Sequence, residues 1–124
     1  MENPIRVLVA NRPRLMRELI VTTLASQSDI EIVDEIADET NILKSIEETN
    51  PDFVIIAQDK LAERPNVCDT TLQRRPDVRI VAISPRRDYF IYFWASPEIH
   101  SRHVNASEET LLGILRAKPL RGVA

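Results

Sequence analysis

This 124-residue chain contains three apolar stretches rich in β-branched residues, and each is followed by polar residues. If the stretches are buried strands, the polar residues after them lie at the surface. In an open parallel sheet the carboxyl ends of the strands meet at one edge, and ligands bind there. The stretch at residues 53–57 is apolar throughout and follows an Asn-Pro break, so we expect it to be the central buried strand. At the carboxyl end of that strand the positions to inspect for chemistry are Ala57, Gln58 and Asp59, of which Ala57 offers no reactive group.

Several familiar chemistries find no support among the reactive side chains. Ser84 has no histidine at a recognisable spacing, which argues against nucleophilic catalysis. Cys68 is the single cysteine, so neither a disulfide nor a cysteine zinc site is expected. His100 and His103 fall in a predicted strand, where they would point to opposite faces and form no metal site. With only two glycines there is no phosphate-binding loop, and we predict no enzymatic activity, metal or cofactor.

The elements that position these residues alternate along the chain between strand-like and helix-like patterns. Such alternation predicts a doubly wound α/β domain, with a parallel sheet, right-handed crossovers and helices on both faces. The residue at 38 is a fair cap for the second helix, and Ser107 is expected to start the last one. Strands are predicted at residues 5–10, 30–36, 51–59, 78–84 and 100–104, the last nearer the sheet edge, and helices at 13–25, 38–49, 64–75 and 107–118.

Length and composition favour one domain, residues 1–124, with a single core. The net charge of −3 gives no basic footprint for nucleic acid, and the Arg74-Arg75 and Arg86-Arg87 pairs are typical of solvated surface. The amino terminus has only a short apolar run, too short for a signal sequence or a membrane span. We therefore expect a soluble, cytoplasmic protein that contacts neither membrane nor nucleic acid. The chain ends soon after the last predicted helix, so we also expect no DNA-binding domain after it.

At this point the sequence resembles a response-regulator receiver domain. The resemblance rests on IRVLVA followed by LMRE, on the run from Ile30 into PDFVIIA, on PDVRIVAIS, and on NASEETLLGILRA, in the order typical of receivers of the transcription-factor subfamily. Residues 5–18 and 30–59 align without a gap. The resemblance implies a flavodoxin-like sheet of five parallel strands, with the site at the carboxyl ends of the first, third, fourth and fifth.

The family's phosphorylation site is degenerate in this chain. The acidic pair that holds Mg²⁺ in receivers falls on Asn11 and Arg12, and the aspartate that accepts the phosphoryl group falls on Ala57. The Ser/Thr position is kept as Ser84, and the lysine position falls at about His103 or the residue after it. The resemblance therefore implies a pseudo-receiver that lacks the acceptor.

Physical chemistry also argues against the family's reaction. Mg²⁺ prefers carboxylate oxygens, and a guanidinium about 4 Å from a divalent cation costs roughly 8 kcal/mol at an effective dielectric near 20. Arg12 would therefore keep the site closed to metal, unless it points into solvent. Ala57 has no oxygen to phosphorylate. The alternative is a conventional phosphorylated receiver with a relocated acceptor, such as Asp59 in the loop beyond Ala57 or Asp52 at the opposite end of the strand.

Residues 88–95, DYFIYFWA, hold five of the six aromatic residues and fall where receivers have their fourth helix. One amphipathic helix face cannot bury rings on every side, so either the segment is a covered strand or some rings are exposed. The rings are equally compatible with core filling and with an interface for a protein partner or a second copy in a homodimer. The candidate interface residues are Tyr89, Phe90, Tyr92, Phe93 and Trp94.

Overall fold

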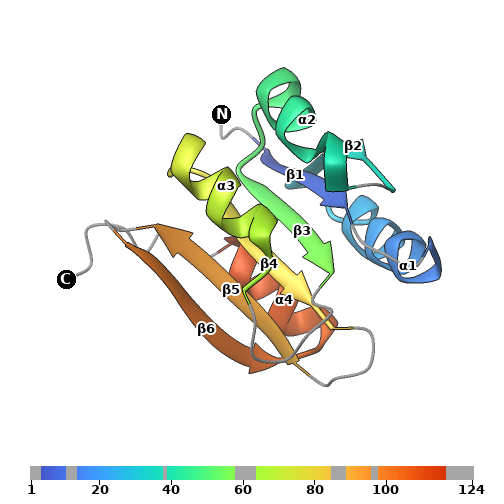
Figure 1. The fold of residues 1–124 in the computed structure, drawn as a ribbon. Coiled ribbons are helices and arrows are strands. Elements are labelled where there is room, and N and C mark those ends of the chain that lie inside the picture. The colour runs from blue at the N-terminus through green and yellow to red at the C-terminus, as the bar shows by residue number, and fades with distance from the viewer. Residues whose placement is uncertain are drawn as a thin grey trace.

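The computed structural model describes residues 4–10, 14–37, 39–57, 64–84, 89–95 and 98–116. Within them a six-stranded sheet has the spatial order β2-β1-β3-β4-β5-β6 (Figure 1). The strands are β1 (Ile5–Ala10), β2 (Ile30–Glu35), β3 (Phe53–Ala57), β4 (Arg79–Ile83), β5 (Tyr89–Ala95) and β6 (Ile99–Asn105). The helices are α1 (Arg14–Ala25), η1, a 3₁₀ turn (Glu39–Asn41), α2 (Ile42–Thr49), α3 (Asn66–Arg74) and α4 (Glu108–Arg116).

The first four strands form the parallel part of the sheet that the sequence predicts. β1 lies between β2 and β3, and β4 continues the sheet beyond β3, all in parallel register. Every side chain of β3 is buried, which accounts for its unbroken apolar sequence, because helices cover both of its faces. The predicted central strand and its neighbours are confirmed.

The predicted sheet of five parallel strands is wrong beyond β4. Residues 89–95 form β5, a strand antiparallel to both β4 and β6, at the place where receivers have a helix. The apolar side chains leave no polar face for a surface helix, whereas a strand can bury both of its faces against helices. The predicted last strand exists as β6, but it lies one position further out and forms the sheet edge.

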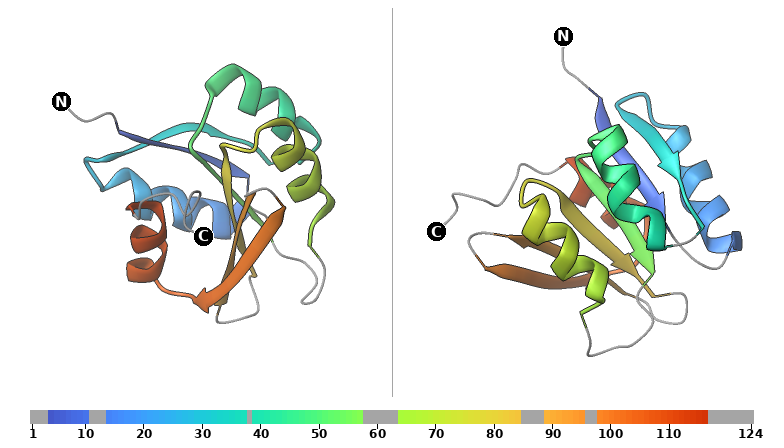
Figure 2. Two further views of the ribbon diagram at one scale, coloured as in Figure 1. Left: turned by 90° about the vertical axis from the view of Figure 1, so that its left-hand side faces the viewer. Right: turned by 45° about the horizontal axis from the view of Figure 1, so that its top comes forward.

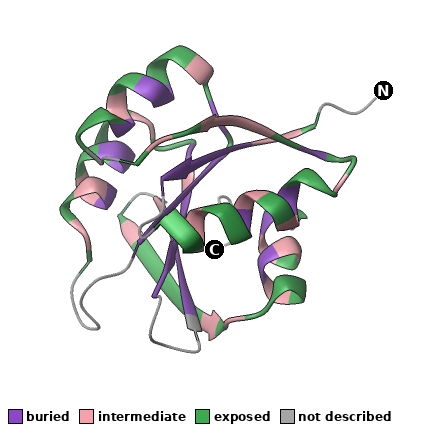
Figure 3. Ribbon diagram, turned by 90° about the vertical axis from the view of Figure 1, so that its right-hand side faces the viewer, coloured by how far each residue is buried: buried purple, intermediate pink, exposed green. Residues whose placement is uncertain are grey.

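Two helices cover each face of the sheet (Figure 2). α1 and α4 lie on one face and α2 and α3 on the other, each contributing to a separate apolar core. β5 supplies both cores by alternation, with Phe90 and Tyr92 facing α1 and α4, and Ile91 and Phe93 facing α2 and α3. Figure 3 shows the buried residues concentrated in the strands at the middle of the sheet. The aromatic segment is thus a structural part of both cores.

Local sequence signals set the ends of the helices. Asn50 adopts a left-handed conformation, with φ of 52°, and its N–H donates to Ile46 O, which ends α2 before Pro51. Ser107 caps α4 as predicted, because its Oγ accepts a hydrogen bond from the Thr110 N–H at 2.9 Å. α2 begins at Ile42 after η1, later than predicted, and the residue expected to cap it lies outside the described residues. No helix in the described ranges has the length and hydropathy needed to cross a membrane.

Candidate functional site

The carboxyl ends of β1, β3 and β4 meet at one edge of the sheet, where the sequence predicts the site. Ala10 is paired with Ile56, and Ala57 with Ile83, so these strands end at nearly the same level. Ser84 follows β4 directly. Ala57 is 2% exposed and Ser84 9% exposed. The structure therefore brings these two predicted site residues to the ends of neighbouring strands, and Ala57 places a methyl group at the end of β3.

The other three predicted site residues, Asn11, Arg12 and Asp59, lie outside the described residues. Closure of the site to metal by Arg12, and a relocated acceptor at Asp59, accordingly stay predictions. Asp52 lies at the opposite end of β3, where its carboxylate accepts a hydrogen bond from the Arg6 N–H at 3.0 Å. Across the ranges that the structure describes, no three histidine, cysteine or acidic side chains are grouped so as to hold a metal ion.

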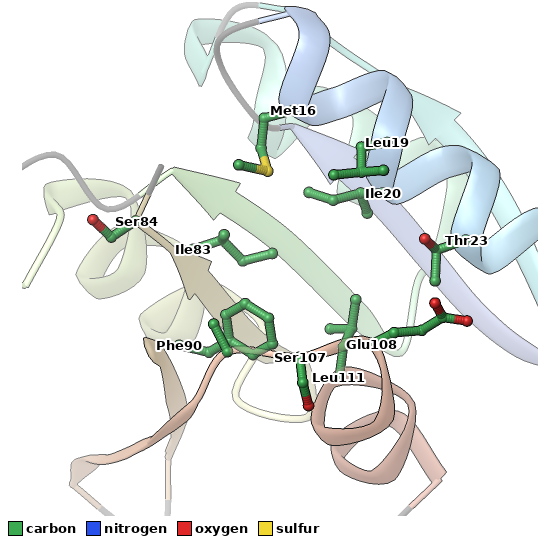
Figure 4. A pocket seen from close by; sticks show the side chains of 11 residues that line it. Met16, Leu19, Ile20, Thr23, Ile83, Ser84, Phe90, Ser107, Glu108 and Leu111 are labelled. Atoms are coloured by element: carbon green, nitrogen blue, oxygen red, sulfur yellow. The ribbon is translucent and has the colours of Figure 1, made fainter. Parts of the chain in front are cut away.

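A cavity of about 310 Å³ opens beside Ser84, between α1 and α4 (Figure 4). Ile83 at the end of β4 and Phe90 on β5 contribute to it from the sheet, and both helices contribute side walls. Among the described residues its lining is largely apolar, with three neutral polar side chains and one charged side chain. The residues that line it are Met16, Leu19, Ile20, Thr23, Ile83, Ser84, Phe90, Ala106, Ser107, Glu108 and Leu111.

The outer surface of α1 beside this cavity carries two exposed leucines. Leu15 is 77% and Leu19 60% exposed, and Leu19 forms part of the cavity wall. The next turns of the same helix bury Ile20 and Leu24 against the sheet. The apolar stripe of α1 is therefore wider than the surface that the described part of the chain covers. Leu19 thereby extends the apolar lining of the cavity to the surface of α1.

Most of the predicted aromatic interface lies inside the protein. Phe90, Tyr92 and Phe93 are 7%, 7% and 3% exposed, so in this fold these three rings serve as core filling. Trp94 is half-buried, with its ring centroid 5.3 Å from that of Tyr92 and stacked at 5.3 Å on His100. The side chain of Tyr89 is not among those that the structure describes. A docking surface on this segment is thus reduced, among the side chains described, to the exposed part of Trp94.

The strand placement of His100 and His103 is as predicted. His100 lies opposite Trp94 on β5, and His103 lies opposite Ile91, whose side chain faces the other core. The two imidazoles therefore point to opposite faces of β6 and share no metal.

Arg79 is a residue whose importance the sequence interpretation missed. Its guanidinium lies 4.7 Å from the centroid of the Phe53 ring, and its Nε and Nη1 atoms are buried without a hydrogen-bond partner. Burial raises the pKa of the neighbouring Tyr92 hydroxyl, and the positive charge of Arg79, together with a hydrogen bond between the two side chains, partly opposes that rise. The available signal was a lone cation within the apolar run of β4.

Sequence comparisons identify no relative: no model of a known protein family matches the chain, and no curated protein matches it. Structural comparison does find similar folds. The signal receiver domain of the response regulator NarL from Mycobacterium tuberculosis superposes with a TM-score of 0.60 at 22% identity, covering 69% of this chain and 70% of that one. The chain has a receiver-type fold.

Two further structures agree with this fold. RcsB from Salmonella typhimurium gives a TM-score of 0.61 at 13% identity, covering 70% of this chain. The match spans 46% of the RcsB chain, so the chain corresponds to less than half of that protein. The response regulator domain of CheB from Thermotoga maritima gives 0.55 at 21% identity, covering 66% of this chain and 61% of that one. At these identities the likeness establishes the fold alone.

Proposed function

We propose that this protein is a receiver-type signalling module that works without phosphorylation, by binding another protein. The observation that supports this most strongly is Ala57, buried at the end of β3 where receivers carry the acceptor aspartate. A methyl group offers no oxygen to a phosphoryl donor and no ligand to Mg²⁺. The module would act without enzymatic activity, metal or cofactor.

The strand ladder makes a relocated acceptor unfavourable. Five register pairs join β3 to β4, from Phe53 opposite Arg79 to Ala57 opposite Ile83. Asp59 is two residues beyond Ala57, so bringing it to the acceptor position would require β3 to slip by two residues against both neighbours. Such a slip would draw the polar residues that follow β3 into the buried part of the sheet, at the cost of desolvating them.

The loss of the acceptor changes how such a module could be regulated. A phosphoryl group shifts a two-state equilibrium only if it binds one state better than the other, and a chain that accepts none has no such input. We therefore expect a constitutive binding surface, whose occupancy follows the concentration of its partner. The partner would be a protein or a second copy of the chain, docking on the face formed by Trp94, β6 and α4.

The proposal is tested by incubating the protein with acetyl phosphate and Mg²⁺ and measuring its intact mass. We expect no adduct, while a receiver that keeps its acceptor aspartate, treated in parallel, should gain one phosphoryl group. A stoichiometric phosphoryl adduct on this chain would contradict the proposal. The Asp59→Asn variant would then decide between a relocated acceptor, whose adduct it abolishes, and an acceptor elsewhere.

A further inference from the structure

The cavity opens on the face of the sheet that α1 and α4 share. β5 lies between β4 and β6 in the sheet, and α4 follows β6 in the chain. α1 lies beside β1 and β2. The last residue of α4 is joined to the segment after α1, because Arg116 pairs with Asp29 at 2.7 Å. Ile83 and Phe90 line the space left between α1 and the first turn of α4.

The size of the cavity suits a small molecule. Its volume of about 310 Å³ lies at the lower end of the range of ligand pockets. Met16, Ile20, Phe90 and Leu111 present apolar surface to it, which favours a ring or branched hydrocarbon over a polar body. Such a body would also cover Leu19, which is 60% exposed.

The charge of the lining selects among such molecules. Among the described residues that line the cavity, Glu108 is the one that carries a charge, and none is a lysine, arginine or histidine. Thr23 and Ser84 add hydroxyl groups that can accept a hydrogen bond. Ser107 is already engaged, because its Oγ donates to Thr110 Oγ1 at 2.7 Å and accepts from the Thr110 N–H. A carboxylate with hydroxyl acceptors favours a cation and repels an anion.

We propose that this cavity binds a small molecule with an apolar body and one ammonium group. The body lies among Met16, Ile20, Phe90 and Leu111, and the ammonium pairs with Glu108 at the edge of the cavity. Figure 4 shows Glu108 reaching from α4 toward the end of the cavity where α1 contributes Thr23. The site shares Ser84 with the acceptor edge and α4 with the proposed docking face, but binding there requires neither phosphorylation nor a protein partner.

The test compares three probes that differ only in the end group: 3-phenylpropylamine, 3-phenylpropanol and 3-phenylpropionate. Each is titrated into the protein while methyl and amide chemical shifts are recorded. The amine should give saturable shifts of Leu19, Ile83 and Leu111. It should bind about fivefold more tightly than the alcohol, the ratio that corresponds to an exposed ion pair of about 1 kcal/mol. The propionate should bind more weakly than either.

Two matched pairs of variants test which side chains of the cavity determine the binding of the probes. Glu108→Gln should remove the preference for the amine, whereas Glu109→Gln, which changes a neighbouring carboxylate that does not line the cavity, should leave it intact. Leu19→Ala should weaken the binding of all three probes, whereas Leu15→Ala should leave the affinity for each probe unchanged. Equal binding of amine and propionate, shifts that map to another surface, or no saturable binding of the amine would overturn the proposal. None of these outcomes bears on phosphorylation, so the site and the proposed function can fail separately.

Discussion

The parallel and antiparallel parts of the sheet differ in how far they are enclosed. β1, β3 and β4 lie in the sheet interior, and β3 is buried at every residue. β6, at the antiparallel end, buries none of its residues fully, and five of its seven are exposed. β5 lies between these regimes and carries most of the aromatic residues of the chain. The parallel part has the receiver-type arrangement of strands. The antiparallel part adds a strand to the sheet and contributes aromatic side chains to both cores.

The largest expected change in stability distinguishes the core residues of β5 from its partly exposed ones. Phe93→Ala should lower the free energy of unfolding by about 3 to 5 kcal/mol, because Phe93 is 3% exposed and the change leaves a cavity. Trp94→Ala should cost about 1 to 2 kcal/mol, because only part of the indole surface is buried. Urea denaturation of both variants measures the difference.

Sedimentation of the same two variants addresses association. If Trp94 contributes to docking of a second copy, Trp94→Ala should abolish any self-association of the wild type while the monomer stays folded. A Trp94→Ala protein that loses as much stability as Phe93→Ala would show that Trp94 is core and that the docking surface lies elsewhere.

A smaller effect is expected from Arg79, which places a cation at the start of an otherwise buried strand. Arg79→Met keeps much of the side-chain volume and removes two buried nitrogens that lack hydrogen-bond partners. Each unsatisfied donor costs about 1 to 3 kcal/mol, against a cation–π contact with Phe53 worth about 0.5 to 2 and a hydrogen bond to Tyr92 worth about 1 kcal/mol. We expect the free energy of unfolding to rise by about 1 kcal/mol. A loss of stability in thermal and urea melts would show that the charge stabilises the junction of the two parts.

The smallest effect concerns the Tyr92 hydroxyl. Burial raises its pKa in the folded state above the usual value near 10, so the folded protein holds this proton more tightly than the unfolded chain. Its contribution to stability is fully present below pH 10 and is lost as pH rises through the folded pKa. Melts between pH 8 and 11 should show a fall in stability above about pH 10, less steep in Tyr92→Phe. Identical profiles for the two proteins would contradict this assignment.

The sequence predicted the parallel part well because its signals there are local. Unbroken apolar runs gave the buried strands, and the Asn-Pro break and Ser107 gave helix boundaries that the structure confirms. The position of Ala57 at the end of β3 followed directly from those runs.

Local sequence signals of this kind do not predict the antiparallel part of the sheet. The rings of residues 89–95 indicate that no simple surface helix forms there. The position of the strand that forms instead depends on its pairing with β4 and β6. The cavity between α1 and α4 depends on that pairing too, since α1 and α4 are far apart in the chain. Arg79 and Tyr92 become neighbours only through the same contact, and composition gives no indication of it.

The central claim is that the carboxyl end of the parallel part has lost its phosphoryl and metal chemistry. Beryllofluoride with Mg²⁺ mimics a phosphoryl group on an acceptor aspartate, so adding both while recording amide spectra tests the claim without a covalent step. We predict no saturable shifts at Ala10, Ala57 or Ser84, and no change in the resonances of β5 and β6. Saturable shifts centred on Ala57 and spreading to Ser84 would show that an acceptor and a metal site persist, and would contradict the account.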